Sequence, residues 1–121
     1  MLNKKMSKSI VQEKSFEFSL SVIKLYKKML EQKEYVLSKQ LLRSGTSIGA
    51  NIEEATAGIS KKDFTAKMSI SSKEARETRY WLRLIKESDL INLEVNEELG
   101  LVEDLINILT SIVKTSQKNI D

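Results

Sequence analysis

The segment LLRSGTSIGANIEEATAGI, residues Leu41–Ile59, combines the spacing of a helix with a concentration of small and polar residues. Gly45 and Gly49 lie four positions apart and therefore on one side of the predicted helix. Each interior glycine weakens a helix by about 1 kcal/mol relative to alanine, so close approach of another helix is needed to compensate. We interpret the segment as a small-residue seam that packs against a neighbouring helix. A second row of small or polar residues runs beside the glycines: Ser44, Ser47, Asn51, Glu54 and Gly58.

The composition favours long helices in a single domain. The chain has 121 residues, the length of one domain, with no proline and only four glycines. It has no cysteine and no histidine, which excludes disulfides and thiolate metal sites and removes the commonest general base and metal ligand. The N-terminal residues include no apolar run long enough for a signal peptide, and no segment approaches ~20 apolar residues, so we expect a cytoplasmic protein.

Apolar periodicity predicts four helices with short connections, and therefore an all-α fold. Ser60, followed three residues later by Asp63, has the pattern of a helix N-cap, and Gly58 suits the end of the preceding helix. Four helices joined in this way form an antiparallel up-down-up-down four-helix bundle. We expect a flexible N-terminus at residues 1–10 and a single domain at residues 11–121. The expected helices run from Val11–Ser15 to Gln32, from Tyr35 to Gly58, from Lys61 to Ser88 and from Val95 to Ser116.

The apolar residues of these helices define the expected core. The first helix carries two neighbouring stripes, and we expect the wide face that they form to be buried in the bundle. The third helix carries a heptad-like seam and the fourth an apolar stripe. The stripes of the first helix are Phe18, Val22, Leu25 and Met29, and Phe16, Leu20, Ile23 and Leu30. The later elements contribute Phe64, Met68, Ser71, Ala75, Thr78, Leu82 and Ile85, and then Leu99, Val102, Leu105, Ile106, Leu109, Ile112 and Val113.

Positive charge is concentrated in the first three helices. Residues 1–86 carry 18 lysines and arginines against 9 acidic residues, whereas residues 87–121 carry 2 against 8. This distribution fits either a generally solvated surface or a basic face for a polyanion. Basic residues of the third helix form a stripe about 15 Å long, which matches several phosphates. The expected nucleic-acid-binding residues are Lys24, Lys27, Lys28, Lys73, Arg76, Arg79, Arg83 and Lys86.

Two aromatic residues, Tyr80 and Trp81, accompany the basic stripe of the third helix. Aromatic rings next to cations can stack on nucleic-acid bases. The spacing of Trp81 equally suits a position in the core of the bundle, and the sequence leaves both interpretations open.

A polar cluster is expected where the second and third helices face each other. They are joined by a tight turn and run antiparallel, so Arg43 comes level with Arg76 and within a turn of Glu74 and Glu77. We expect a partly buried ion pair between Arg43 and one of the glutamates; the alternative is that all three side chains point into water. The serines and the asparagine of the seam are expected to supply further hydrogen bonds. The whole expected cluster is Arg43, Ser44, Ser47, Asn51, Glu54, Glu74, Glu77 and Trp81.

No set of residues predicts catalysis. Ser44 and Ser47 lack a histidine base, and no glycine-rich phosphate loop is present. Di-iron bundles use a Glu-x-x-His pair, which this chain cannot supply. We therefore expect no enzyme activity, no metal and no cofactor. The acidic residues that would have to form an all-carboxylate cation site are Glu53, Glu54, Glu74 and Glu77.

Two segments, Gln40–Ala55 (QLLRSGTSIGANIEEA) and Asp63–Ile85 (DFTAKMSISSKEARETRYWLRLI), resemble the four-helix-bundle proteins encoded in intervening sequences of bacterial 23S ribosomal RNA genes. The resemblance covers residues 16–115. That family is similar in turn to the accessory protein of diversity-generating retroelements, a barrel-like homopentamer that binds nucleic acid and a reverse transcriptase. The resemblance therefore implies a homo-oligomer, a pentamer, with a basic binding surface. The motifs are Gln40-Leu41-x-Arg43-Ser44, Ser47-Ile48-x-x-Asn51-Ile52-x-Glu54 and Glu74-x-x-Glu77-x-x-x-Trp81-Leu82.

Two functions follow from these observations. The first is a non-enzymatic, oligomeric protein that binds RNA or DNA and is accessory to ribosomal RNA intervening sequences or to a reverse transcriptase. The alternative is a protein-interaction scaffold that docks an acidic protein partner. Neither function involves a membrane. Both need a basic surface, so the sequence predicts the surface and leaves the partner open.

Overall fold

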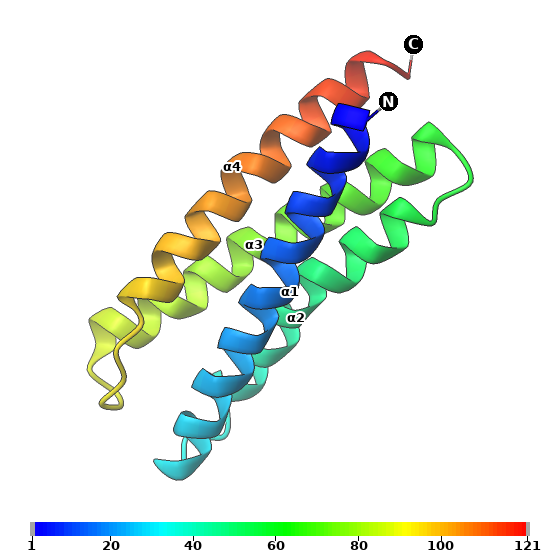
Figure 1. Cartoon of the computed structure of the whole chain (residues 1–121). Helices are drawn as coiled ribbons and strands as arrows, with labels where there is room; N and C mark the ends of the chain where they lie inside the picture. The colour runs from blue at the N-terminus through cyan, green and yellow to red at the C-terminus, as the bar shows by residue number, and fades with distance from the viewer. Residues whose placement is uncertain (1, 121) are drawn as a thin grey trace.

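Four long helices follow one another along the chain. The computed structural model describes the backbone of residues 2–120 and the side chains of residues 10–120. The helices are α1 (Leu2–Glu31), α2 (Leu37–Thr56), α3 (Lys61–Ser88) and α4 (Asn96–Lys118), as labelled in Figure 1. Consecutive helices run in opposite directions, which confirms the expected antiparallel up-down-up-down four-helix bundle (Figure 1).

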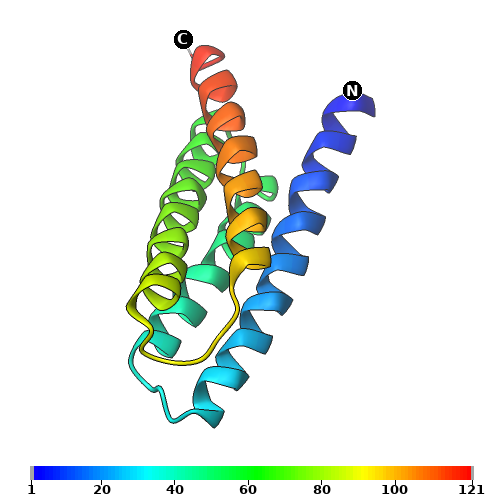
Figure 2. The ribbon, with the colours of Figure 1, turned by 90° about the vertical axis from the view of Figure 1, so that its left-hand side faces the viewer.

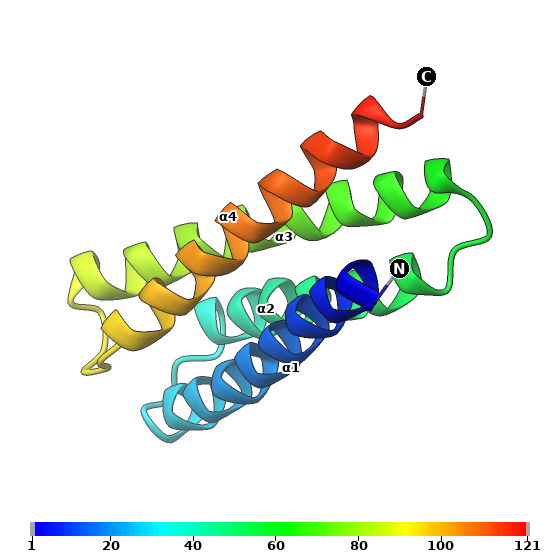
Figure 3. The ribbon, with the colours of Figure 1, turned by 45° about the horizontal axis from the view of Figure 1, so that its top comes forward.

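The helices occupy the corners of a square in cross-section. α1 packs on α2, α2 on α3, α3 on α4, and α4 more sparsely on α1, whereas the pairs α1–α3 and α2–α4 make no close backbone contact among the described residues. Figure 3 shows α1 and α2 on one side of the bundle and α3 and α4 on the other. Because α1 and α3 are diagonal, their outer surfaces face opposite directions.

The helix boundaries agree with the sequence pattern best around α3. This helix spans Lys61–Ser88 as expected, and the Ser60 hydroxyl accepts a hydrogen bond from the Asp63 backbone N–H at 3.1 Å. α1 differs most, because it begins at Leu2 rather than near Val11. No glycine or proline interrupts the preceding residues, so the helical backbone can continue through them. The flexibility expected for residues 1–10 stays a prediction, and Met1 and the side chains of residues 2–9 lie outside the described residues.

The heptad-like seam of α3 lies in the centre of the core, as predicted. Met68, Ala75 and Leu82 are fully buried, and Phe64 packs against them in part. Two hydroxyl groups of the seam are buried, and each of them donates a hydrogen bond to α2. Ser71 donates to the backbone carbonyl of Ile48 on α2 at 2.8 Å, and Thr78 donates to the α2 hydroxyl of Ser44 at 2.9 Å. The buried apolar residues of α4 are Val102, Leu105, Ile106 and Leu109, with Leu99, Ile112 and Val113 packed against the core.

One of the two apolar stripes of α1 is exposed, which corrects the sequence-based expectation. Phe18, Val22, Leu25 and Met29 are buried as predicted, and Leu30 is partly buried. The other stripe faces away from both neighbouring helices, because within the described range α1 packs only on α2 and, more sparsely, on α4. Figure 2 shows α1 diverging from α4 toward its N-terminus. The exposed stripe consists of Phe16 at 65%, Leu20 at 47% and Ile23 at 37% exposure.

The glycines of α2 lie against α1, which confirms the predicted close approach of another helix. A Cβ atom added to Gly45 would lie 2.8 Å from both methyl carbons of Val22 on α1. At Gly49 the added atom would lie 3.4 Å from the carbonyl oxygen of Ser15, also on α1. The 2.8 Å separation is too short for two carbon atoms, so Gly45 is the position at which the α1–α2 packing requires glycine.

Candidate nucleic-acid interface

The predicted ion pair between α2 and α3 is present and involves both glutamates. Arg43 donates to Glu74 Oε2 at 3.0 Å through one guanidinium nitrogen and to Glu77 Oε2 through the other. The indole N–H of Trp81 donates to the same oxygen of Glu77 at 2.9 Å. We call these four residues the polar cluster. It links the two helices and fixes the ring of Trp81, which also packs against the core.

The charged groups of the polar cluster stabilise each other's ionised forms. The hydrogen bond from Trp81 lowers the pKa of Glu77, and Arg43 lowers it further. The hydrogen bond to Glu77 raises the pKa of Arg43. The Arg43 side chain is nevertheless 49% exposed, against 18% for Glu74 and 35% for Glu77. The ion pair is therefore screened by water and weaker than a buried pair would be.

The other residues assigned to this cluster from the sequence have different partners. Ser47 donates to the backbone carbonyl of Arg43, and Asn51 donates to that of Ser47. Ser44 donates to the carbonyl of Gln40 and accepts from Thr78. The three side chains therefore make the expected further hydrogen bonds, but none of these bonds reaches the side chains of Arg43, Glu74 or Glu77. Glu54 pairs separately with Lys67 on α3 at 2.9 Å.

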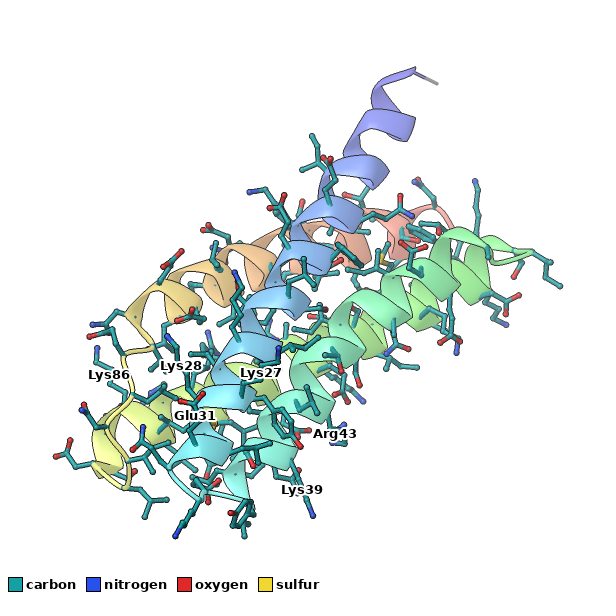
Figure 4. The ribbon with its side chains drawn as sticks, turned by 60° about the horizontal axis from the view of Figure 1, so that its bottom comes forward. Lys27, Lys28, Glu31, Lys39, Arg43 and Lys86 are labelled. Atoms are coloured by element: carbon teal, nitrogen blue, oxygen red, sulfur yellow. The ribbon has the colours of Figure 1, made fainter. Side chains whose placement is uncertain are left out.

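The eight cations expected to bind nucleic acid divide between two faces of the bundle. Four lie at the end formed by the C-termini of α1 and α3, and we call them the lysine cluster: Lys24, Lys27, Lys28 and Lys86. All four side chains are exposed, and none forms an ion pair in the part of the chain that the structure describes. Figure 4 shows Lys27 and Lys28 on α1, Lys86 on one flank, and Lys39 and Arg43 of α2 on the other.

The end of α1 is fixed next to the α3–α4 connection. Gln32 donates through its side-chain amide to the backbone carbonyl of Asn92 at 2.6 Å, and its side-chain oxygen accepts from the Asn92 backbone N–H at 3.0 Å. This reciprocal pair places Lys28, one turn earlier on α1, near the end of α3 that carries Lys86. Lys39 of α2 was not among the cations expected from the sequence. It is exposed and, like the lysine cluster, forms none of the ion pairs found among the described side chains.

The remaining four expected cations lie on α3, and three of them have partners. Arg79 contacts both carboxylate oxygens of Glu103 on α4, at 3.0 and 3.2 Å. Arg83 pairs with Glu87 on its own helix at 3.3 Å. Arg76 donates to the hydroxyl of Thr110 on α4 at 3.1 Å, whereas Lys73 is exposed. The α3 stripe therefore has less free positive charge than its sequence suggests, because acidic α4 neutralises part of it.

Glu103 is the residue that the sequence reasoning missed. The argument that placed Arg43 level with Glu77 also applies to α3 and α4, which are antiparallel about the connection at residues 89–95. Positions equidistant from this connection place Arg79 within a turn of Glu103. The same sequence signal could therefore have found this ion pair.

No cluster of three or more acidic residues that could hold a metal ion occurs among the described residues. Within the same range, no helix is both long and apolar enough to cross a membrane. A cavity of about 560 Å³ lies at the end of the bundle opposite the lysine cluster, and its apolar floor includes Phe64, Met68 and Ile112.

The geometry first defines a class: an all-α four-helix bundle whose second and third helices are joined by an Arg–Glu–Glu–Trp cluster. Residues 7–112 match the family model described as 23S rRNA-intervening sequence protein, and the chain belongs to this family. The resemblance inferred from the sequence is thereby confirmed.

One solved structure shows how closely the fold is shared. It is a protein of unknown function from the S23 ribosomal protein family of Bacteroides thetaiotaomicron, and it is 44% identical to this chain. The match covers 89% of this chain and 98% of that one, with a TM-score of 0.84. A comparison with curated proteins gives no match.

Proposed function

We propose that this protein is a non-enzymatic, oligomeric bundle that binds nucleic acid through its basic surface. The observation that carries the proposal is the lysine cluster, whose four ammonium groups are exposed and unpaired within the described range. Unpaired surface lysines repel one another, and a phosphate backbone relieves this repulsion while releasing its own counterions. Lys39 extends the same surface onto α2 (Figure 4).

The proposed partner is a nucleic acid, RNA or DNA. The family name refers to intervening sequences of 23S ribosomal RNA, and an RNA of this kind is the first ligand to test. A reverse transcriptase remains the protein partner that the family resemblance implies.

Self-association is the second part of the proposal, and the exposed stripe of α1 supports it. Phe16, Leu20 and Ile23 recur at spacings of four and three, so they form one continuous apolar strip on the outer side of the helix. Water-exposed phenylalanine and leucine in such a strip favour burial against another surface. We propose a homo-oligomer in which this strip is covered, with five subunits as the number implied by the family resemblance.

Charge-matched variants test the nucleic-acid proposal. The first variant is Lys24→Gln/Lys27→Gln/Lys28→Gln; the control, Lys61→Gln/Lys62→Gln/Lys114→Gln, removes the same charge at the opposite end of the bundle. We expect the first to weaken binding of a structured RNA at least tenfold, and the control to weaken it much less. Equal, weak binding by the wild type and both variants would refute the proposal. It would favour the scaffold function, in which the same lysines dock an acidic protein.

A further inference from the structure

Tyr80 is an exposed aromatic residue at the centre of the basic stripe of α3. Its side chain is 55% exposed, although removing a tyrosine ring from water is energetically favourable. Arg76 lies four residues before it and Arg83 three residues after it, so both are its neighbours on the helix surface. Lys73 lies one turn further along the same face. We call these four residues the α3 strip.

The ring of Tyr80 is held in place by the polar cluster. Its centroid lies 5.2 Å from that of Trp81, and the two ring planes meet at 69°, an edge-to-face arrangement. Trp81 is itself fixed by its hydrogen bond to Glu77, which Arg43 holds from α2. Tyr80 therefore lies against a fixed support while more than half of its side chain remains in water. Little conformational entropy is left to lose when a flat ligand stacks on it.

The cations of the α3 strip remain accessible to a phosphate backbone, although two of them have partners. Arg76 donates to Thr110 on α4, and Arg83 donates to Glu87 on α3 itself. Both arginines remain exposed, as does Lys73. Cations beside a supported aromatic ring are the combination by which proteins bind single strands, because every base has a face that can stack.

We propose that the α3 strip binds single-stranded nucleic acid, with one unpaired base stacked on Tyr80. The inference rests on the proposed function and adds that this strip selects single-stranded over duplex nucleic acid. Bases inside a duplex are stacked on each other and cannot reach Tyr80, so the strip discriminates against duplexes. Three members of the lysine cluster, Lys24, Lys27 and Lys28, lie on α1, diagonally across the bundle from α3, and contact phosphates of either form.

Tyrosine variants test this inference, and the chain supplies a matched control. Tyr80→Leu removes the ring and keeps an apolar side chain, whereas Tyr80→Phe keeps the ring. Tyr35→Leu makes the same change at a tyrosine of nearly equal exposure, 54%, located before α2 and outside the α3 strip. The ligands are an unstructured RNA of about 12 nucleotides and a duplex of the same length. Trp81 is the only tryptophan, so its fluorescence reports stacking beside it.

The expected result is a loss of affinity in one variant, Tyr80→Leu, and for one ligand, the single strand. Tyr80→Leu should bind the single strand about tenfold more weakly than the wild type and the duplex equally well. Tyr80→Phe and Tyr35→Leu should match the wild type. The single strand should change Trp81 emission in the wild type and in these two variants, and leave it unchanged in Tyr80→Leu. Unchanged single-strand affinity in Tyr80→Leu would overturn the inference while salt-dependent binding through the lysine cluster persists. Absence of salt-dependent binding to any nucleic acid would instead refute the proposed function.

Discussion

Replacing Gly45 with alanine is the sharpest test of the α1–α2 packing. The added methyl group would lie 2.8 Å from both methyl carbons of Val22, which is fully buried and cannot move into solvent. Gly100 on α4 provides the reference, because an added Cβ meets no atom within 4 Å there. Both positions are inside helices, so both substitutions share the same gain in helix propensity.

The difference between these two substitutions isolates the packing cost. Gly100→Ala should stabilise the protein by about 0.5–1 kcal/mol, since alanine loses less conformational freedom on folding than glycine. Forcing an additional methyl group into a packed core costs about 1–3 kcal/mol. Gly45→Ala should therefore be less stable than Gly100→Ala by about 1–3 kcal/mol, and no more stable than the wild type.

Urea unfolding followed by circular dichroism measures these differences. A further background, Val22→Ala, removes the two methyl carbons that collide with the new group. In that background Gly45→Ala should become stabilising, because it partly fills the cavity left by valine. Equal stabilisation by Gly45→Ala and Gly100→Ala in the wild-type background would refute the reasoning, since it would mean that α1 does not approach α2 as closely as described.

Three further predictions concern the contacts between α2 and α3. A double-mutant cycle on Arg43→Ala and Glu77→Ala should give a coupling of about 0.5–1 kcal/mol, because the pair is half exposed; a coupling near zero would exclude the ion pair in solution. The pKa of Glu77 is lowered in the folded state from an ordinary value of 4.5, so its contribution to stability is complete above about pH 4.5 and is lost as the pH falls further. Glu77→Gln should accordingly flatten the acid limb of a plot of unfolding free energy against pH, and an unchanged limb would contradict the assignment. Ser71→Ala should lower the free energy of unfolding, measured with urea, by about 1 kcal/mol, because it removes a buried hydrogen bond to an α2 carbonyl. An unchanged free energy of unfolding would show that this bond does not stabilise the fold.

The sequence allowed prediction of the features that depend on local spacing and on short connections. Gly45 and Gly49 required a close neighbour, and α1 is that neighbour. The tight turn between α2 and α3 allows only one alignment of the two helices, so the sequence alone predicts Arg43 opposite Glu74 and Glu77. In both cases a single steric or geometric constraint determined the result.

The exposed stripe of α1 could not be predicted in the same way. Phe16, Leu20 and Ile23 have the same residue types as the buried stripe beside them, and hydrophobicity alone assigns both to the core. Which stripe is buried depends on the rotation of α1 about its axis, and on its sparse contact with α4. The pairing of Arg79 with Glu103 escapes prediction for a different reason: the charges along α3 alone do not reveal it, and it follows only when α3 is aligned with α4.

The dependence of RNA affinity on salt tests the central proposal most directly. Fluorescence anisotropy would follow binding of a structured RNA between ~50 and ~300 mM salt, with light scattering recording the oligomer mass of each sample. We predict a steep linear decrease of log K with log salt, and a slope smaller by about 2 in Lys24→Gln/Lys27→Gln/Lys28→Gln at unchanged mass, since each lost phosphate contact removes about 0.7–0.9 from the slope. A flat salt dependence, or the same slope in the wild type and this variant, would contradict the account.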